Sequence, residues 1–391
     1  MQKKLLIAGG SHADIPIIMA AKDLGYWVIT TGNNPNDLGH KFSDEYYLED
    51  YSNPEKILKL AKTLVTDAIC ASSNDFSAIS CAYTAQKLHL PGHDDYETAL
   101  IIHHKDKFRK FSLENNILVP KAVSLSINDN IHLVNLELNY PVIVKPVDLS
   151  GGKGITKVEA KENLNKAIYD AFKLSKNNKI VIEEFIEGTN HGYSTFIKNG
   201  KVVFAFMDDE HYFINPYLVS GASTSLQYTK HISDQLNESL HLMASKLNLV
   251  DGLLHVQFIL KDDTPYIIEI CRRTPGDLYV KLVEYATGFN MSKAIVKSTI
   301  GKTIDDYTID NISYIARHCV MNEQQGYIDH VIYSDLAPKI FDKMIFYTSG
   351  DFIKDPLVYK AEIDFIRYED KEDMSKNINS IAQNIKIELS Q

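Results

Sequence analysis

The segment between Val142 and Ile155 holds residue types that suit the binding of a polyphosphate. Its sequence, VIVKPVDLSGGKGI, begins with a short β-branched run, which predicts a buried strand ending at Lys145. Glycines in the following loop have no Cβ atom, so backbone N–H groups can approach phosphate oxygens closely, and the lysines add positive charge. A glycine-rich turn with two solvated lysines is the alternative that this short pattern leaves open. The loop comprises Ser150, Gly151, Gly152, Lys153 and Gly154.

A candidate metal pair lies about a hundred residues further on. Gln257 and Glu269 belong to two strand-like segments, LLHVQFI and PYIIEICRR, that are separated by a polar turn. If these strands pair, the two side chains can lie on one face, where an amide oxygen and a carboxylate suit a hard cation such as Mg²⁺. For Glu269 alone, an ordinary salt-bridged carboxylate is the simpler interpretation. Of Arg272 and Arg273, which follow, one could neutralise a transferring phosphoryl group and the other could be a structural ion-pair donor.

A third segment, IVIEEFIEG, is an apolar strand that runs into two carboxylates and then into apolar side chains. A flat base needs apolar faces and hydrogen bonds along its edge, and main-chain atoms at Glu183 to Ile186 can supply the latter. An amphipathic strand end is the alternative for this segment alone.

Composition limits the classes of partner. The chain has 391 residues, a formal net charge of −10 and 45% hydrophobic residues, which predicts two or three globular domains and argues against nucleic-acid binding. No apolar run is long enough for a membrane span or a signal-peptide core. The cysteines form no C-x-x-C pair, so we expect neither disulfides nor zinc, and a cytoplasmic location. They are Cys70, Cys81, Cys271 and Cys319.

Strand and helix patterns alternate through the first hundred residues, which predicts a parallel sheet covered by helices. The expected strands are 4–8, 27–31 and 67–72, and the expected helices are 15–24, 54–66 and 76–88. The turn at Gly9 and Gly10 lacks the full G-x-G-x-x-G spacing, because Ser11 and Ala13 stand where glycines would be needed. A nicotinamide cofactor is therefore disfavoured.

The remaining residues predict an α+β architecture, so the chain as a whole is expected to be a multidomain α/β and α+β protein. A hairpin turns at Asn199 and Gly200, and the tail ends in a mixed-charge helix near 373–387. The other expected helices are 105–115, 164–175 and 235–247, and further strands lie near residues 122, 142, 157 and 180. The expected domains are 1–103, 104–190, 191–302 and 303–391.

The order of these pieces resembles the ATP-grasp superfamily of carboxylate–amine ligases. The matching pieces are a lysine helix with Asp106, Lys107 and Arg109, then VIVKP, SGGKG, EEFIEG, HVQF and IIEICRR. Within the superfamily the chain looks like the L-amino-acid ligases and the proteins related to carbamoyl-phosphate synthase. The resemblance covers about residues 1–300 and implies an N-terminal parallel-sheet domain before the ATP-grasp fold. The tail, with QQGYID and SGDFIKD, is similar to a small β-rich C-terminal module.

The resemblance implies ATP and Mg²⁺ as cofactors, with Mn²⁺ as a substitute for Mg²⁺. It assigns Gln257 and Glu269 to the metal, and Arg273 and Lys153 to the catalytic work on the transferred phosphoryl group. The implied nucleotide-binding residues are Lys107, Lys145, Ser150, Gly151, Gly152, Gly154, Glu183, Glu184, Phe185, Ile186 and His191.

Three positions depart from the superfamily pattern. Gln257 replaces a common glutamate, as in carbamoyl-phosphate synthase, and leaves less negative charge for the metal. Cys271 stands where an asparagine usually helps to bind the metal, and a thiol is a poor ligand for magnesium. The glutamate that usually binds ribose is absent from GTNHGYS, where Asn190, His191 or the earlier Glu187 must substitute.

The implied activity is ATP-dependent joining of a small-molecule carboxylate to an amine through an acyl phosphate, with release of ADP and phosphate. One alternative is a bicarbonate-using carboxylase or carbamoyl-phosphate type of enzyme, and another is a catalytically decayed ATP-binding regulatory protein. Proteins of this kind are often homodimers. The polar stretch 207–226 is expected to line the acceptor pocket, with His211, Tyr212, Ser223 and Asp277 as candidates.

Overall fold

The computed structural model describes residues 2–129, 137–147, 149, 154–334 and 336–390. Four of the five residues of the predicted phosphate loop, Ser150, Gly151, Gly152 and Lys153, lie outside the described residues. The fifth, Gly154, has φ +73°, and a Cβ atom there would lie 3.1 Å from side-chain atoms of Leu174 and Pro146. Only glycine adopts this conformation readily, so this position at the end of the loop requires glycine.

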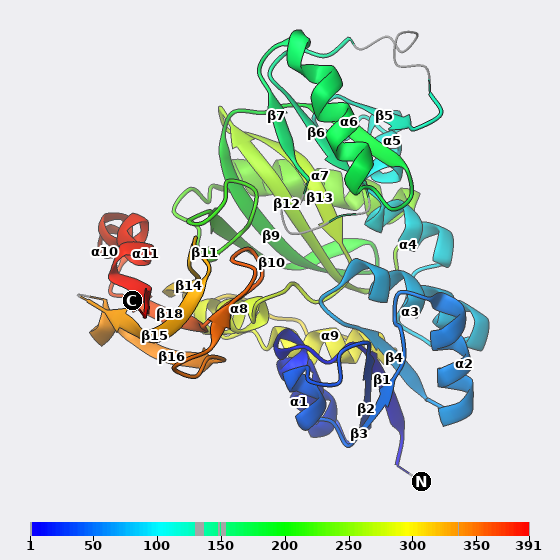
Figure 1. Ribbon diagram of the computed structural model, residues 1–391. Helices are drawn as coiled ribbons and strands as arrows, with labels where there is room; N and C mark the ends of the chain where they lie inside the picture. The colour runs from blue at the N-terminus through cyan, green and yellow to red at the C-terminus, as the bar shows by residue number, and fades with distance from the viewer. Residues whose placement is uncertain (1, 130–136, 148, 150–153, 335, 391) are drawn as a thin grey trace.

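The N-terminal part is a parallel sheet with helices on both faces, as predicted (Figure 1). Its strand order is β3-β2-β1-β4, from β1 (Lys4–Ala8), β2 (Trp27–Gly32), β3 (Glu45–Leu48) and β4 (Ala68–Ala71). The helices are α1 (Ile15–Asp23), α2 (Pro54–Leu64) and α3 (Asp75–Leu88). In β1, Leu5 and Ile7 pack on the side of α1, while Leu6 and Ala8 pack on the side of α2 and α3. All four side chains are fully buried, which explains the continuous apolar run of this strand.

The middle part is a small antiparallel sheet of order β5-β8-β6-β7. The helices of this part precede the sheet in the chain or pack on it. One of them, α4, was not predicted from the sequence. The strands are β5 (Ala122–Ser126), β6 (Val142–Pro146), β7 (Thr156–Val158) and β8 (Lys179–Glu184). The helices are α4 (Tyr96–His103), α5 (Lys105–Glu114) and α6 (Leu164–Leu174).

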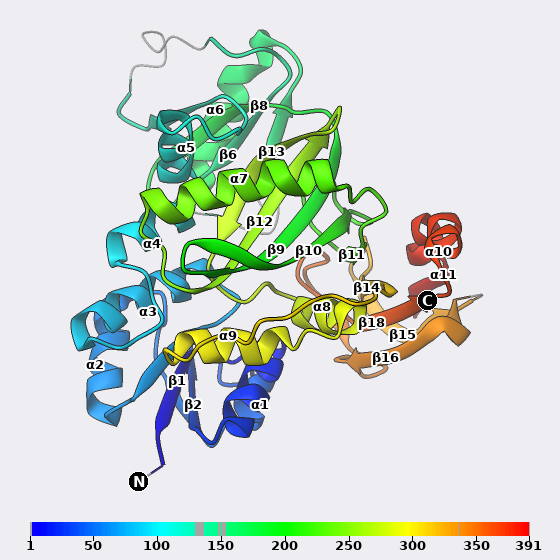
Figure 2. The same cartoon turned by 180° about the vertical axis from the view of Figure 1, so that it is seen from behind.

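An eight-stranded sheet forms the centre of the molecule, in the order β13-β12-β9-β10-β11-β14-β18-β16. Helix α7 crosses one face, as Figure 2 shows, and α8 and α9 pack on the other. The first five strands are β9 (Thr189–Lys198), β10 (Lys201–His211), β11 (Gly221–Thr224), β12 (Gly252–Lys261) and β13 (Thr264–Cys271). The others are β14 (Tyr314–Val320), β16 (Ile340–Ile345) and β18 (Glu362–Tyr368). The helices are α7 (Lys230–Lys246), α8 (Tyr279–Thr287) and α9 (Met291–Thr299).

The hairpin between β9 and β10 turns at Asn199 and Gly200, with φ +51° and +73°, as the sequence predicted. Three strands from beyond residue 302 extend the central sheet, so the sheet is continuous across the predicted boundary between the third and fourth domains. The division of the chain into four domains stays a prediction. No helix in the described part of the chain combines the length and apolar character needed to cross a membrane.

The predicted helix at 373–387 is wrong in its second half. Two short helices, α10 (Lys371–Asn377) and α11 (Ile381–Asn384), are followed by strand β19 (Ile385–Leu389). Strand β19 pairs with β15 (Gly326–Tyr333), which also pairs with β17 (Phe352–Ile353). Ile385 and Ile387 are buried while Lys386 and Glu388 are exposed, a two-residue period that favours a strand once a partner is present.

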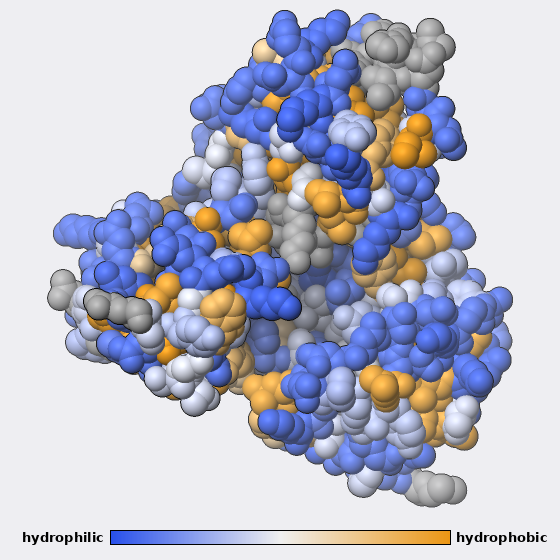
Figure 3. Space-filling model, viewed as in Figure 1, coloured by the Kyte–Doolittle hydropathy of each residue, from blue (hydrophilic) through white to orange (hydrophobic). Residues whose placement is uncertain are grey.

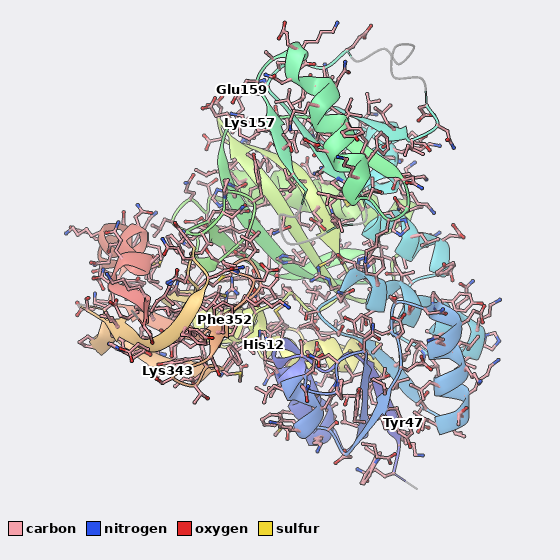
Figure 4. The ribbon with its side chains drawn as sticks, viewed as in Figure 1. His12, Tyr47, Lys157, Glu159, Lys343 and Phe352 are labelled. Carbon is pink, nitrogen blue, oxygen red and sulfur yellow. The ribbon has the colours of Figure 1, made fainter. Side chains whose placement is uncertain are left out.

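Two carboxylates are buried next to each other on β18. Glu362 and Asp364 lie on one face of the strand and are fully buried. Glu362 accepts a hydrogen bond from Tyr333 and lies 3.8 Å from Lys343 Nζ, a side chain labelled in Figure 4. Neither oxygen of Asp364 has a hydrogen-bond partner among the described residues. Burial, together with the charge of Glu362, raises the pKa of Asp364 to about 8.

This raised pKa predicts how stability depends on pH. Between about pH 4 and pH 8 the folded chain binds a proton at Asp364 that the unfolded chain releases, so stability should fall as the pH rises through that window. The Asp364→Asn variant cannot ionise there and should have a free energy of unfolding about 1–3 kcal/mol higher at pH 8. Unfolding curves from pH 5 to pH 9 test this, with Asp329→Asn, an exposed carboxylate on β15, as the control. A parallel pH dependence in wild type and Asp364→Asn would contradict the prediction.

Candidate functional site

A cavity of about 800 Å³ opens between the small middle sheet and one face of the central sheet. Figure 3 shows the molecule hollowed where its N-terminal, middle and C-terminal parts meet. Side chains from β6, β8, β12 and β13 line this cavity, together with Ser73 from the connection after β4 and Asp75 at the start of α3. A second chamber of about 180 Å³ shares Gln257, Glu269 and Arg273 with it. Those three residues therefore stand at the junction of the two spaces.

Lys145 and Glu183 lie on neighbouring antiparallel strands at the wall of the large cavity. Lys145 Nζ donates to Glu183 Oε2 at 2.7 Å, and Arg109 Nε lies 2.9 Å from Glu183 Oε1. Burial alone would raise the pKa of Glu183, but the charges of Arg109 and Lys145 outweigh it and lower that pKa to about 2. Two cations thus share one carboxylate, which leaves an excess positive charge suited to phosphate. The side chain of Glu183 holds these cations in place.

Lys105 reaches the cavity, whereas Lys107 does not line it. Lys105 Nζ donates to Leu149 O at 3.2 Å and lies 3.7 Å from Glu269 Oε1. Both lysines are in the first turn of α5, and two residues correspond to about 200° around a helix, so they point in nearly opposite directions. The geometry therefore favours Lys105 for the phosphate contact that the sequence assigned to Lys107.

The far end of the cavity offers apolar surfaces for a flat group. Glu184, Phe185 and Ile186 line it together with apolar side chains of β6, β12 and β13. Glu184 accepts hydrogen bonds from the backbone N–H and the side-chain amide of Asn139, both at 2.9 Å. Lys157, labelled in Figure 4, lies 4.2 Å from the centre of the Phe185 ring. The end of β8 thus offers apolar surface to a flat group, while the backbone N–H groups of Glu184 and Phe185 already donate to Lys121 O and Pro141 O, both at 2.9 Å.

His191, the residue assigned to ribose, is buried on the opposite face of β9 from the cavity. Its Nδ1 lies 2.9 Å from Asp209 Oδ1, its Nε2 lies 2.7 Å from Thr189 Oγ1, and its ring stacks on Phe258. The two-residue period of the strand places Asn190 on the cavity side instead. Of the substitutes considered for the missing ribose ligand, Asn190 is the one that the geometry favours.

Gln257 and Glu269 are direct cross-strand partners in the antiparallel pairing of β12 and β13. Gln257 Nε2 donates to Glu210 Oε1 at 2.6 Å. This bond fixes the orientation of the amide and leaves Gln257 Oε1 available as an oxygen ligand beside the Glu269 carboxylate. We did not single out Glu210 from the sequence, although a carboxylate within the strand-like segment FAFMDDEH is a signal of a functional residue.

The donor set fits a magnesium ion that is completed by phosphate oxygens. Two oxygen donors stand together, and no group of three or more His, Cys, Asp or Glu side chains in the described residues is arranged to hold a metal by itself. Cys271 is buried, with its Sγ 3.7 Å from Arg273 O, and burial raises the pKa of its thiol to about 11. The thiol is therefore protonated at neutral pH and is not part of the donor set.

Arg273 is anchored by a residue from the N-terminal part of the chain. Its Nε donates to Asp75 Oδ1 at 2.9 Å and its Nη2 to Asp75 Oδ2 at 3.4 Å, while His103 Nδ1 lies 2.9 Å from the same Oδ1. Burial would raise the pKa of Asp75, but the charge of Arg273 and the contact with His103 lower it. We assigned no role to Asp75 from the sequence, although an acidic residue directly after a predicted parallel strand is a signal of a ligand-binding position.

Arg272 has a different environment. Its Nε donates to Asp94 Oδ2 at 2.8 Å and its Nη2 to Val250 O at 2.6 Å, away from the large cavity. The two adjacent arginines therefore differ in position: Arg273 lines the large cavity and Arg272 does not, while the roles assigned to them stay predictions.

The polar stretch 207–226 supplies part of the wall of both spaces. Tyr212 lines the large cavity and Asp277 lines both spaces, whereas His211 and Ser223 bond to each other at 2.9 Å outside them. Asp277 lies 3.1 Å from Lys360 Nζ and 3.5 Å from Nε2 of His12, a side chain labelled in Figure 4. Arg317 on β14 also lines the small chamber, and nothing in the sequence marked it.

Comparison with known proteins identifies the family of the middle part of the chain. Residues 104–276 match the family model of the ATP-grasp domain. The carbamoyl phosphate synthase large chain of Pseudothermotoga lettingae is 26% identical over 303 residues, which cover 75% of this chain and 27% of that protein. The chain therefore spans about a quarter of the length of the curated relatives that it matches.

Solved structures show the same fold over the whole chain. L-amino acid ligase from Bacillus licheniformis has a TM-score of 0.82 at 17% identity, with 100% of both chains covered. The biotin carboxylase domain of the Hydrogenobacter thermophilus 2-oxoglutarate carboxylase, solved with MgADP, ADP and bicarbonate, has a TM-score of 0.76 at 19% identity, over 99% of this chain and 91% of that one. The resemblance found in the sequence is confirmed: residues 104–276 are an ATP-grasp domain, and the chain as a whole has the ATP-grasp fold.

Proposed function

We propose that this protein is an ATP-dependent ligase that joins a carboxylate to an amine through an acyl phosphate. The observation that carries the proposal is the position of Gln257, Glu269 and Arg273 at the junction of the large cavity and the small chamber. A nucleotide in the large cavity would place its terminal phosphate at this junction, facing a substrate in the chamber.

The charged residues have distinct tasks in this reaction. Lys145 and Lys105 hold the phosphates, and the slot at Phe185 and Ile186 holds the base. Gln257 and Glu269 would hold magnesium, which neutralises phosphate charge and orients the terminal phosphoryl group. Most of the catalysis is positioning and charge neutralisation, since phosphoryl transfer asks little covalent chemistry of the protein.

Two bond changes complete the reaction. A carboxylate oxygen of the first substrate attacks the terminal phosphorus, the bond to the β-phosphate oxygen breaks, and ADP leaves with that electron pair. The nitrogen of the second substrate then attacks the acyl carbon, the carbon–oxygen bond to phosphate breaks, and the nitrogen loses a proton. Arg273 stands where it can stabilise the negative charge that develops in both steps.

Two buried carboxyl groups in the chamber support an amine as the second substrate, whereas bicarbonate would be an alternative to the carboxylate as the first substrate. Burial raises the pKa of both Asp208 and Glu210, and an ammonium group bound between them would favour their ionised form. ADP release should therefore require both a carboxylate and an amine, and mass spectrometry should detect the amide product. Release of ADP that depends on bicarbonate alone would support the carboxylase alternative instead. ATP binding with no ADP formation in any substrate pair would support a regulatory protein.

The bond between Gln257 and Glu210 generates a charge-exchange prediction. Gln257→Glu supplies the carboxylate that is common at this position, but it places that carboxylate within hydrogen-bond distance of Glu210, so the affinity for ATP in the presence of Mg²⁺ should fall by roughly tenfold. Gln257→Glu combined with Glu210→Gln restores one amide and one carboxylate and should recover that affinity. Calorimetric titration with Mg²⁺ and a non-hydrolysable ATP analogue measures both. Equal affinities in wild type and Gln257→Glu would show that the bond between Gln257 and Glu210 does not govern nucleotide binding.

The anchoring of Arg273 generates a second prediction. Asp75→Asn removes the charge that holds the guanidinium, so kcat should fall by roughly 100-fold while the KM for ATP changes little. Asp94→Asn breaks the matching ion pair of Arg272 and should lower the melting temperature but keep kcat within about twofold of wild type. Steady-state ADP release and thermal melting of both variants separate the two roles. A similar loss of kcat in both variants would show that Asp75 has only a structural role.

A further inference from the structure

Arg317 presents an incompletely paired cation to the small chamber. It lies on β14 with 3% of its surface exposed, and its Nε has no hydrogen-bond partner among the described residues. Nη1 donates to Asp277 O at 3.0 Å and lies 3.7 Å from Asp277 Oδ2. Asp277 is already paired with Lys360 at 3.1 Å. A buried guanidinium has five donors and is costly to leave unpaired, so this one is suited to bind an anion that enters the chamber.

Asp208 and Glu210 present two carboxyl groups to the same chamber. Both lie on β10, two residues apart and therefore on one face, and Asp208 is 1% exposed. Asp208 accepts a hydrogen bond from Tyr279, and Glu210 accepts from Tyr212 and Gln257 at 2.6 Å each. These donors are all neutral, and no described Lys, Arg or His nitrogen forms an ion pair with either carboxylate. The pair is suited to bind a cation.

Glycine at position 192 is what allows Asp208 to lie in the chamber. Gly192 on β9 is the direct cross-strand partner of both Asp208 and Gln257. A Cβ atom at Gly192 would come within 2.3 Å of Asp208 Oδ1. Since β9 has no side chain here, the carboxylates of β10 can extend across it toward Gln257 and the junction with the large cavity. The negative side of the chamber is thus next to the predicted site of phosphoryl transfer.

A ligand that satisfies both sides must carry both charges. A ligand with a carboxylate alone would leave Asp208 and Glu210 without a cationic partner, and a simple amine would leave Arg317 without an anion. We propose that the chamber binds the amine substrate as a free amino acid, with its carboxylate on Arg317 and its ammonium group between Asp208 and Glu210. This inference rests on the proposed ligase function only in naming that amino acid as the nucleophile. Its nitrogen then lies on the side of the chamber that adjoins Gln257 and Arg273.

Calorimetry on the full chain tests the subsite without requiring turnover. With Mg²⁺ and a non-hydrolysable ATP analogue present, the twenty standard L-amino acids are titrated in pools. Each amino acid that binds is then compared with its decarboxylated amine and with its deaminated carboxylic acid. We expect each half-molecule to bind at least about tenfold more weakly than the amino acid, because each leaves one side of the chamber unpaired.

Variants assign the two halves of the subsite. In Arg317→Gln, the affinity for the amino acid should fall to that of its amine, and Arg317→Lys should retain part of it. In Asp208→Asn combined with Glu210→Gln, the affinity should fall to that of the carboxylic acid. Arg367→Gln, an exposed arginine on the neighbouring strand β18, is the matched control and should bind as wild type does. Melting curves show whether each variant is folded.

Three results would overturn the inference. They are no binding of any amino acid while the nucleotide analogue binds, equal binding of an amino acid and one of its halves, and unchanged affinity in a folded Arg317→Gln protein. The wild-type comparison of half-molecules decides even if the variants do not fold. Amino acid binding without ADP release for any carboxylate partner would leave the subsite in place and remove the ligase function. If amines that lack a carboxylate drive ADP release equally well, the ligase function would stand and the amino acid subsite would be removed.

Discussion

The antiparallel pairing of β12 and β13 is the constraint on which the site depends. It places Gln257 opposite Glu269, and the same face of β12 carries His255 toward the small chamber. Because side chains alternate along a strand, a slip of one residue would turn this set of polar groups into the apolar layer under α7. That layer contains Val256, Phe258 and Ile267, which are buried against the helix. The apolar face therefore holds the polar face in register.

Buried charges in the site are mostly held by partners from distant parts of the chain. Glu183 holds Lys145 and Arg109, and Asp75 holds Arg273 with His103 alongside. Such pairs fix long side chains in one position, which matters more for phosphoryl transfer than the stability that each pair adds. Asp208, Glu210 and Arg317 differ, since the described residues leave them without full charge partners. Such a site, paired around the proposed nucleotide and unpaired around the proposed acceptor, would hold one ligand in place and select another.

The N-terminal sheet takes part in this arrangement directly. Asp75 begins α3 just after β4, at the carboxyl end of a parallel strand, where side chains of such sheets commonly meet ligands. From there it reaches the arginine that follows β13, so the position of the reacting end of the site depends on the contact between two parts of the chain. His12, from the same end of the N-terminal sheet, reaches Asp277 beside the chamber. The N-terminal part is therefore a wall of the site.

Short-range patterns in the sequence determined most of the strands and helices, and the pairing of Gln257 with Glu269. The parallel strands, the hairpin at Asn199 and Gly200, and the facing of Gln257 and Glu269 all depend on neighbouring residues and on strand periodicity. The choice of Lys105 over Lys107, the burial of His191 and the strand at 385–389 depend on which surface each segment meets, and that is set by packing between distant segments. The parts played by Asp75 and Arg317 could be identified only from the tertiary structure. Asp75 contacts Arg273, 198 positions away in the sequence, and Arg317 contacts Asp277, 40 positions away, and no local spacing predicts such contacts.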